Sequence, residues 1–336
     1  MKTMKLCVKL LSVLLCVAML LMCAGCGNGS SSGDSTADKK LKVGVIQYMS
    51  HPSLDNCYAG VEQALKASGL DITIDRQIGS DASADADCST YAENMVAQKY
   101  DMIVAIATPA ATSAYAKTEG SNIPVIFCAV SDPVAAELVQ SMDKPGDLCT
   151  GTSDVLDMEA QVELIHSMQP DATKIGVLYT TSEANSITQL ELLKTAAAKY
   201  NMTVEPSGVQ NASDIPSAAT ALAAKVDCIN NFTDNNVVNN LPVLLDAANT
   251  AGIPVYGSEV EQVKNGCLAS MSIDYVALGN VTGEMAVKVL KGESPANMAV
   301  KTISEATPVV NTEVLAALKM TMPEAYKDAE TVTTNK

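Results

Sequence analysis

The chain has 336 residues, of which 48% are hydrophobic, and its formal net charge at pH 7 is −16. Arg76 is the single arginine, and Trp is absent. Because phosphate contacts need clustered Lys and Arg side chains, this acidic composition argues against a nucleic-acid-binding protein. The length accommodates two domains of ordinary size.

The first 40 residues are typical of an export signal followed by a linker. Three lysines precede an apolar run over 10–22, which is shorter than a membrane-spanning helix. Two small residues then lead to Cys26, and this order resembles a bacterial lipoprotein signal. The resemblance implies removal of residues 1–25, a lipid on Cys26 and attachment to the outer face of the bacterial cell membrane. Ordinary cleavage without a lipid is the alternative. Residues 26–40 are predicted to form a flexible tether.

Beyond residue 40, short apolar runs alternate with helix-length stretches. Most runs are β-branched and nearly continuous, as expected of parallel strands that are covered on both faces. The predicted strands span 42–48, 72–77, 101–107, 124–130, 174–179, 203–209, 226–232, 253–257 and 267–272. The predicted helices span 55–68, 85–99, 109–118, 133–142, 157–168, 186–200, 213–224, 236–251 and 276–291. The alternation predicts an α/β fold built from doubly wound parallel sheets.

An internal repeat divides this pattern into two similar lobes. The phrase KVGVIQYMSHPSLD at 42–55 returns as KIGVLYTTSEANSI at 174–187, and later strands in each half begin with Asp and then with Ile-Pro. We expect lobe 1 to comprise 41–152, completed by about 275–305. Lobe 2 is then 153–274, completed by about 306–330. Hinge crossings are predicted near residues 149 and 270 and between 298 and 308.

The predicted binding site lies where the two lobes face each other. Ligands of parallel sheets collect beyond the carboxyl ends of the strands, where helix N-termini present free N–H groups. The candidate residues follow strand ends or a crossing: Tyr48, His51, Thr108, Pro109, Ala110, Ser131, Asp132, Glu183, Ala184, Asn185, Phe232, Thr233, Asp234, Asn235 and Asp274. Several of the hydroxyl and carboxylate side chains could instead cap helices.

The charge of these candidates differs between the lobes. Lobe 1 offers hydroxyls and helix N-termini, which suit a carboxylate, whereas Glu183, Asp234 and Asp274 suit an ammonium group. The two together predict a zwitterion such as an amino acid. Dicarboxylates and phosphates are disfavoured because no arginine lies near these positions in the sequence. Phe232 is a candidate for stacking on a ligand ring.

Catalytic, metal and cofactor sites are not expected. No nucleophile–His pair or Cys/His spacing typical of a metal site occurs in the sequence. Six cysteines follow Cys26, and whether they form disulfides is left open by their even number. They are Cys57, Cys88, Cys128, Cys149, Cys228 and Cys267.

The phrases VAIATPAA, VIFCAVSDPV, TDNNV and SIDYVALGNVTGEMA resemble the tryptophan/tyrosine-type family of ABC transporter substrate-binding proteins, and the likeness extends over about 41–310. The resemblance implies a type I periplasmic-binding-protein fold that closes on a ligand, often an aromatic amino acid. It also implies a membrane permease and its ATPase as partners. Ligand contacts are implied at 108–110, 131–132, 183–185, 233–235 and Asp274.

Two departures from the family pattern fall at the expected side-chain pocket. Ser50 and Ser53 flank His51-Pro52 where the family often has Glu and a small apolar residue, and Phe232 stands where it often has Pro. A receptor for a sugar or a signalling molecule with the same fold is the alternative. The low aromatic content, 4%, weighs against a sugar.

Overall fold

The computed structural model describes residues 40–303 and 306–335. The predicted signal segment, the tether and Cys26 lie outside the described residues. Within the described residues, no helix is long and apolar enough to cross a membrane. The six cysteines after Cys26 are all buried free thiols.

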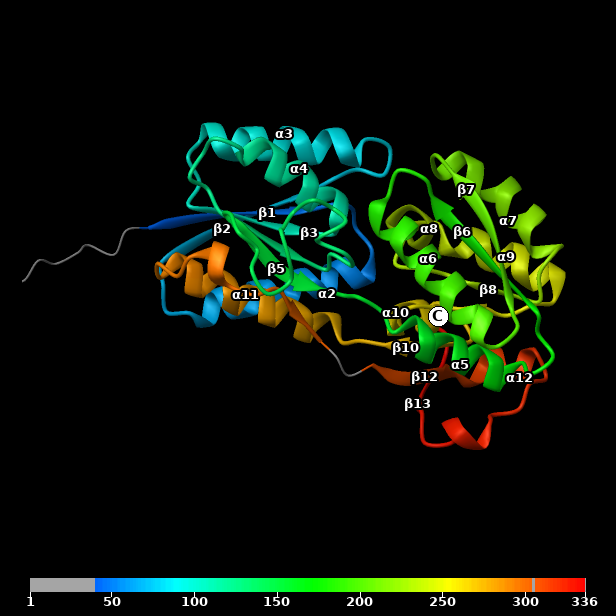
Figure 1. Cartoon of the computed structure of the whole chain (residues 1–336). Helices are drawn as coiled ribbons and strands as arrows, with labels where there is room; N and C mark the ends of the chain where they lie inside the picture. Colours follow the sequence, from blue (N-terminus) through cyan, green and yellow to red (C-terminus); the bar gives the residue numbers. More distant parts are fainter. Residues whose placement is uncertain (1–39, 304–305, 336) are drawn as a thin grey trace, which may run out of the picture. The chain divides into compact units, whose positions relative to one another are not determined.

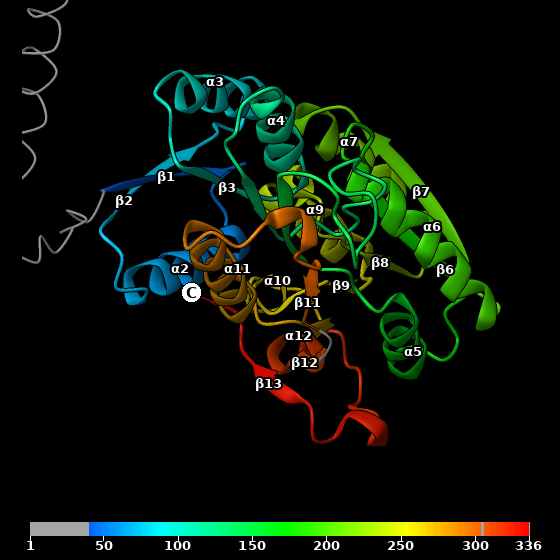
Figure 2. The same cartoon turned by 60° about the vertical axis from the view of Figure 1, so that its left-hand side comes forward.

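Lobe 1 is built around a six-stranded sheet with the order β11-β5-β4-β3-β1-β2, and its strand pairs are parallel. Its elements are β1 (Leu41–Gln47), α2 (Pro52–Ala67), β2 (Ile72–Ile78), α3 (Ala84–Ala97), β3 (Met102–Ile106), α4 (Thr108–Thr118), β4 (Val125–Cys128), β5 (Cys149–Ser153), α11 (Tyr275–Leu290) and β11 (Lys301–Thr302). Helices α3 and α4 cover one face of the sheet, and α2 and α11 cover the other (Figures 1 and 2). This cover explains why β3 and β4 are buried along their whole length.

Lobe 2 contains a four-stranded parallel sheet, β7-β6-β8-β9, and a three-stranded sheet, β10-β12-β13. Backbone hydrogen bonds between Leu268 and Val255 and between Gly257 and Ala269 join the two sheets. The elements are α5 (Met158–Met168), β6 (Lys174–Thr180), α6 (Ala184–Lys199), β7 (Thr203–Val209), α7 (Ile215–Ala223), β8 (Cys228–Asn230), α8 (Asn235–Asn239), α9 (Leu241–Ala251), β9 (Val255–Tyr256), α10 (Val260–Lys264), β10 (Ala269–Ser272), β12 (Thr307–Asn311), α12 (Thr312–Ala317) and β13 (Glu330–Val332).

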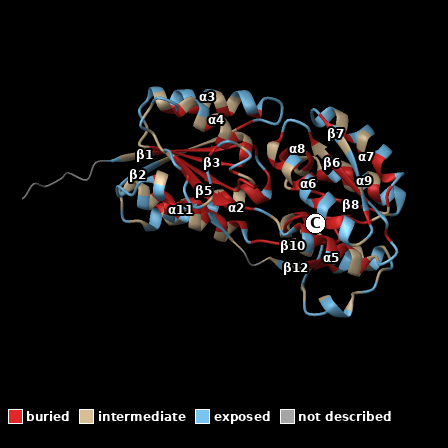
Figure 3. Cartoon of the chain, in the orientation of Figure 1, coloured by how far each residue is buried: buried red, intermediate tan, exposed pale blue. Residues whose placement is uncertain are grey.

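Each lobe has its own hydrophobic core. One buried cluster fills lobe 1, and two others fill lobe 2. In Figure 3 the buried residues follow the strands and the inner sides of the helices. The predicted fold class is therefore confirmed, because parallel sheets covered on both faces form two lobes, as the alternating pattern indicates.

The predicted helix over 133–142 is wrong. The chain forms a single turn there, in which the Asp132 carboxylate accepts the N–H of Ala135 at 2.9 Å. Glu137 then adopts a left-handed backbone with φ 58°, and the N–H groups of Leu138 and Val139 both bond to the carbonyl of Pro133. The left-handed residue stops the helical hydrogen-bond series after one turn.

The predicted helix over 236–251 is divided into α8 and α9. Asn240 lies between them with φ −108° and ψ 19°. Pro242 has no N–H to continue the helical series, and the residue before a proline disfavours the helical conformation. The division matters for function because it leaves the short helix α8 at the end of β8.

The closest helix packing in lobe 1 joins α2 to α11, which are far apart in the sequence. A Cβ added at Gly60 would lie 2.1 Å from the carbonyl oxygen of Val276, and one added at Gly279 would lie 2.1 Å from that of Cys57. The two backbones therefore touch. This contact ties α11 to lobe 1 after the chain has passed through lobe 2.

Gly279→Ala is expected to lower the free energy of unfolding by about 1–3 kcal/mol, because the added methyl group forces the two helices apart. Urea denaturation followed by circular dichroism measures the change. Glu284→Ala, at an exposed position of the same helix, should change it by less than about 0.5 kcal/mol. Equal stability of Gly279→Ala and the unchanged protein would contradict the close contact.

Candidate functional site

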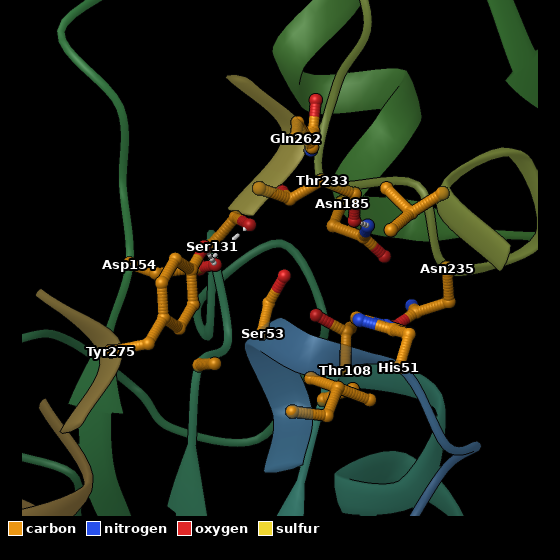
Figure 4. A pocket seen from close by; sticks show the side chains of 14 residues that line it. His51, Ser53, Thr108, Ser131, Asp154, Asn185, Thr233, Asn235, Gln262 and Tyr275 are labelled. Carbon is orange, nitrogen blue, oxygen red and sulfur yellow. Dashed lines mark hydrogen bonds between the residues drawn. The ribbon is translucent and has the colours of Figure 1, made fainter. Parts of the chain in front are cut away.

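A cavity between the lobes is lined by residues that follow the carboxyl ends of the strands. Its space amounts to about 340 Å³ when the open mouth is included. Figure 4 shows the side chains that converge on it. The lining residues are His51, Ser53, Leu54, Ala107, Thr108, Ala129, Ser131, Asp154, Asn185, Thr233, Asn235, Val238, Gln262 and Tyr275.

The lobe 1 wall contains the N-termini of α2 and α4. Neither helix receives a hydrogen bond from the side chain of its N-cap residue, which is His51 for α2 and Ala107 for α4. The first N–H groups of a helix have no partner within the helix, and its N-terminus carries a partial positive charge. Two uncapped N-termini at one wall therefore favour an anionic group of a ligand.

The turns that lead from β3 and β4 to this wall carry backbone strain. Ala107 has φ 83° and ψ 154°, a region that is essentially restricted to glycine, and Ala129 has φ 56°. Both residues line the cavity. Each such conformation costs about 1–3 kcal/mol, so the surrounding packing holds these two turns in place.

Asp154 is the one carboxylate among the residues that line the cavity. Its side chain accepts hydrogen bonds from Ser131 Oγ and Tyr275 Oη, each at 2.9 Å, and only 3% of the residue is exposed. Burial raises the pKa of this carboxyl group above its usual value. No lysine or arginine is among the lining residues, so the carboxylate is available to a cationic group of a ligand.

The lobe 2 wall is organised by Glu183, which lies behind the lining residues. Its carboxylate accepts the backbone N–H of Asn235 at 3.2 Å, Asn235 Nδ2 at 2.7 Å, the backbone N–H of Asn236 at 3.3 Å and Asn185 Nδ2 at 3.3 Å. Burial, with a smaller contribution from the charge of Asp234, raises the pKa of Glu183 to about 8. Glu183 thus fixes two amide side chains that face the cavity.

Side-chain hydrogen bonds join the lobes at the cavity. His51 Nε2 lies 3.4 Å from Asn235 Oδ1, and Gln189 Nε2 donates to Ser131 Oγ at 3.1 Å and to Thr233 Oγ1 at 2.7 Å. Burial lowers the pKa of His51 to about 4, so the imidazole is neutral at pH 7. These contacts hold the cavity in a closed arrangement.

The structure brings six of the fifteen predicted residues to the cavity wall: His51, Thr108, Ser131, Asn185, Thr233 and Asn235. Pro109 and Ala110 lie in the first turn of α4, and Ala184 begins α6, but none of the three lines the cavity. Phe232 is fully buried in the lobe 2 core, which leaves it no ring face for stacking. Tyr48 lines a different hollow, together with Asp81 and neighbouring residues.

The three carboxylates that were predicted to bind an ammonium group accept hydrogen bonds from the protein itself. Asp274 caps α11 by accepting the N–H groups of Val276 and Ala277. The Asp234 carboxylate is fully buried and accepts four bonds, from the N–H and hydroxyl of Thr180, the hydroxyl of Ser186 and the N–H of Val237. The carboxyl group of Glu183 accepts hydrogen bonds from Asn185, Asn235 and Asn236. None of the three is among the residues that line the cavity.

Several lining residues do not follow from the sequence reasoning. Asp154 directly follows β5, so the rule that finds polar groups at strand ends could have found it if the segment had been treated as a strand. Tyr275 adjoins Asp274 and lies at the start of α11. Gln262 lies on the short helix α10 and carries no comparable signal. No group of His, Cys, Asp and Glu side chains with metal-binding geometry occurs among the described residues.

Asp234→Asn is expected to lower the free energy of unfolding by at least about 2 kcal/mol, because an amide nitrogen cannot accept the bonds that a carboxylate oxygen accepts. Thermal and urea unfolding measure the loss. Asp246→Asn, at an exposed position of α9, is the matched control and should leave the stability nearly unchanged. If Asp234→Asn has the same melting temperature as the unchanged protein, the buried hydrogen bonds of Asp234 do not stabilise the fold.

Comparison with known proteins identifies the family. A family model described as ABC transporter substrate binding protein matches residues 42–332. A tyrosine-binding protein of Clostridioides difficile is 38% identical over 326 residues, which is 93% of this chain and 92% of the relative.

Solved structures of similar proteins support the same family. A domain from Streptococcus pneumonia in complex with L-Trp matches with a TM-score of 0.83 and 37% identity, over 87% of this chain and 100% of that one. A ligand-free, open substrate binding protein with adhesive properties from Clostridium difficile matches with a TM-score of 0.66 and 37% identity, over 88% and 100%. The chain belongs to the ABC transporter substrate binding proteins, a family of solute-binding proteins rather than enzymes.

Proposed function

We propose that this protein is an extracytoplasmic receptor of an ABC importer and that it binds an aromatic amino acid as a zwitterion between its lobes. The observation that carries the proposal is that one cavity contains both a group that favours a cation and groups that favour an anion. Asp154 offers a buried carboxylate, and the uncapped N-termini of α2 and α4 offer N–H groups. An α-amino acid carries the two complementary groups on one carbon atom.

The α-carboxylate of the ligand would bind at the lobe 1 wall. Thr108 begins α4, and Ser53 lies in the first turn of α2, so both helices can direct backbone N–H groups at one anion. The hydroxyl of Thr108 adds a donor at the same wall.

The α-ammonium group would bind Asp154. Ser131 and Tyr275 already donate to this carboxylate, and their bonds fix its orientation. A bound ammonium would supply the positive charge that a buried carboxylate needs. The ligand side chain would then extend toward lobe 2, where Asn185, Thr233, Val238 and Gln262 line the cavity.

The relatives support an aromatic side chain. One is a tyrosine-binding protein, and another was solved with L-Trp. The chain also matches the Trp-bound relative better than the open, ligand-free one, with TM-scores of 0.83 and 0.66 at the same 37% identity. This difference supports a mechanism in which the ligand stabilises the closed arrangement of the lobes.

Binding is tested by isothermal titration of the purified protein, after unfolding and refolding to remove carried-over ligand, with the common amino acids, sugars and nucleosides. Binding of tyrosine or tryptophan is expected. A receptor that binds only a sugar or another signalling molecule would overturn the proposed ligand class and leave the fold unaffected.

Asp154→Asn is expected to weaken binding of tyrosine or tryptophan by about 100-fold or more, because the ammonium loses its buried counter-charge. The change in Kd from the same titration measures this loss. Asp132→Asn is the matched control, since Asp132 lies one residue from Ser131 but caps a turn outside the cavity. Equal affinity of Asp154→Asn and the unchanged protein would refute the proposed orientation.

The N-terminal sequence supports a lipid anchor at Cys26, as part of the same proposal. Cys26→Ala is expected to abolish incorporation of labelled fatty acid and to release the protein from the membrane fraction. It should also reduce uptake of the labelled ligand through the permease and ATPase. Retention of the label in Cys26→Ala would contradict the anchor, and undiminished uptake in a strain without this protein would contradict the importer role.

A further inference from the structure

Two buried hydrogen-bond acceptors at the cavity have no partner, and one comes from each lobe. They are Asn185 Oδ1 and His51 Nδ1. Asn185 and His51 both line the cavity and are 3% and 7% exposed. In Figure 4 they lie with Asn235 on one side of the cavity, and Asp154 and Tyr275 lie on the other.

The orientation of the Asn185 amide is fixed by its neighbours. Its Nδ2 donates to Glu183 Oε2 at 3.3 Å and to the backbone carbonyl of Thr233 at 3.2 Å. The carbonyl of Thr233 can only accept a hydrogen bond, so the amide nitrogen must face it. The carbonyl oxygen Oδ1 is therefore the atom left over, and it can only accept a hydrogen bond.

The same reasoning fixes the tautomer of His51. Asn235 Nδ2 donates to Glu183 Oε2 at 2.7 Å, so Asn235 Oδ1 is an acceptor that faces His51 Nε2. Nε2 must then carry the hydrogen, and Nδ1 of the neutral ring is an acceptor. Glu183 thus determines the hydrogen-bonding character of both side chains without lining the cavity itself.

Buried acceptors without a donor are unfavourable, and a bound ligand that supplies the donor is favoured over one that does not. The α-ammonium is expected at Asp154, on the other side of the cavity. A donor on the ligand side chain would then satisfy an acceptor on this side. A phenol O–H or an indole N–H meets this requirement, whereas a phenyl ring does not.

We infer that Asn185, held by Glu183 and assisted by His51, selects aromatic amino acids whose ring carries a hydrogen-bond donor and discriminates against phenylalanine. The inference rests on the proposed function, because it assumes that the ligand is an aromatic amino acid. It assigns Asn185 as a specificity-determining residue and Glu183 as a positioning residue.

Titration calorimetry with matched ligand pairs tests the inference on the unchanged protein. Tyrosine is compared with phenylalanine, and tryptophan is compared with 3-benzothienylalanine, in which sulfur replaces the indole N–H at nearly constant shape. The donor-bearing member of each pair is expected to bind about 10- to 100-fold more tightly. Equal affinities within both pairs would overturn the inference and leave the proposed function intact. Failure of all four ligands to bind would overturn the proposed function itself.

The variant Asn185→Leu tests whether Asn185 causes the difference in affinity between tyrosine and phenylalanine. The substitution removes the acceptor at similar side-chain volume, so the tyrosine to phenylalanine affinity ratio should fall toward one. Asn249→Leu, at an exposed position of α9, should keep the native ratio. An equal loss of affinity for both ligands would place the ammonium at Asn185 and refute the assignment. If Asn185→Leu does not fold, the ligand pairs on the unchanged protein still decide the inference.

Discussion

The proposed ligand recognition depends on one buried carboxylate. Asp154 has hydroxyl donors from Ser131 and Tyr275, and no ion pair of this side chain occurs within the described residues. Removing such a charge from water is costly unless it is neutralised or paired, and the raised pKa of Asp154 reflects that cost. In the proposed function, the ammonium group of the ligand offsets this cost. Because Asp154 follows β5 and Tyr275 begins α11, the hydroxyl from α11 meets the carboxylate where the chain passes between the lobes.

Acidic residues cap several helices of the fold: Asp157 caps α5, Asp234 caps α8, Glu259 caps α10 and Asp274 caps α11. Helices α2 and α4 of lobe 1 and α6 of lobe 2 have no side-chain cap. A side-chain cap satisfies one or two of the free N–H groups at a helix N-terminus, whereas an uncapped helix retains all of them. In the proposed function, the uncapped N-termini of α2 and α4 bind the ligand carboxylate although the protein as a whole is strongly acidic.

Much of the fold could be predicted from the sequence, because continuous β-branched runs and a repeated strand phrase depend on local composition. The repeat also located the strand ends that form the cavity, and His51, Thr108, Ser131, Asn185, Thr233 and Asn235 line it. The sequence alone could not distinguish an acidic residue that caps a helix from one that lines the cavity. Asp234 and Asp154 both follow strands, and only the packing of Thr180 and Ser186 around Asp234 distinguishes them. Three of the four hydrogen bonds to Glu183 come from Asn235 and Asn236, which lie 52 and 53 residues away in the sequence, so its positioning role is likewise a property of the tertiary structure.

A crystal structure of the protein, from crystals grown in the presence of L-tyrosine, tests the proposed orientation of the ligand most directly. The account predicts closed lobes, the ligand nitrogen within hydrogen-bond distance of the Asp154 carboxylate, the ligand carboxylate at the N-termini of α2 and α4, and the phenol oxygen near Asn185. A ligand bound in the reverse orientation, with its ammonium at Asn185 and its ring against Asp154, would contradict it.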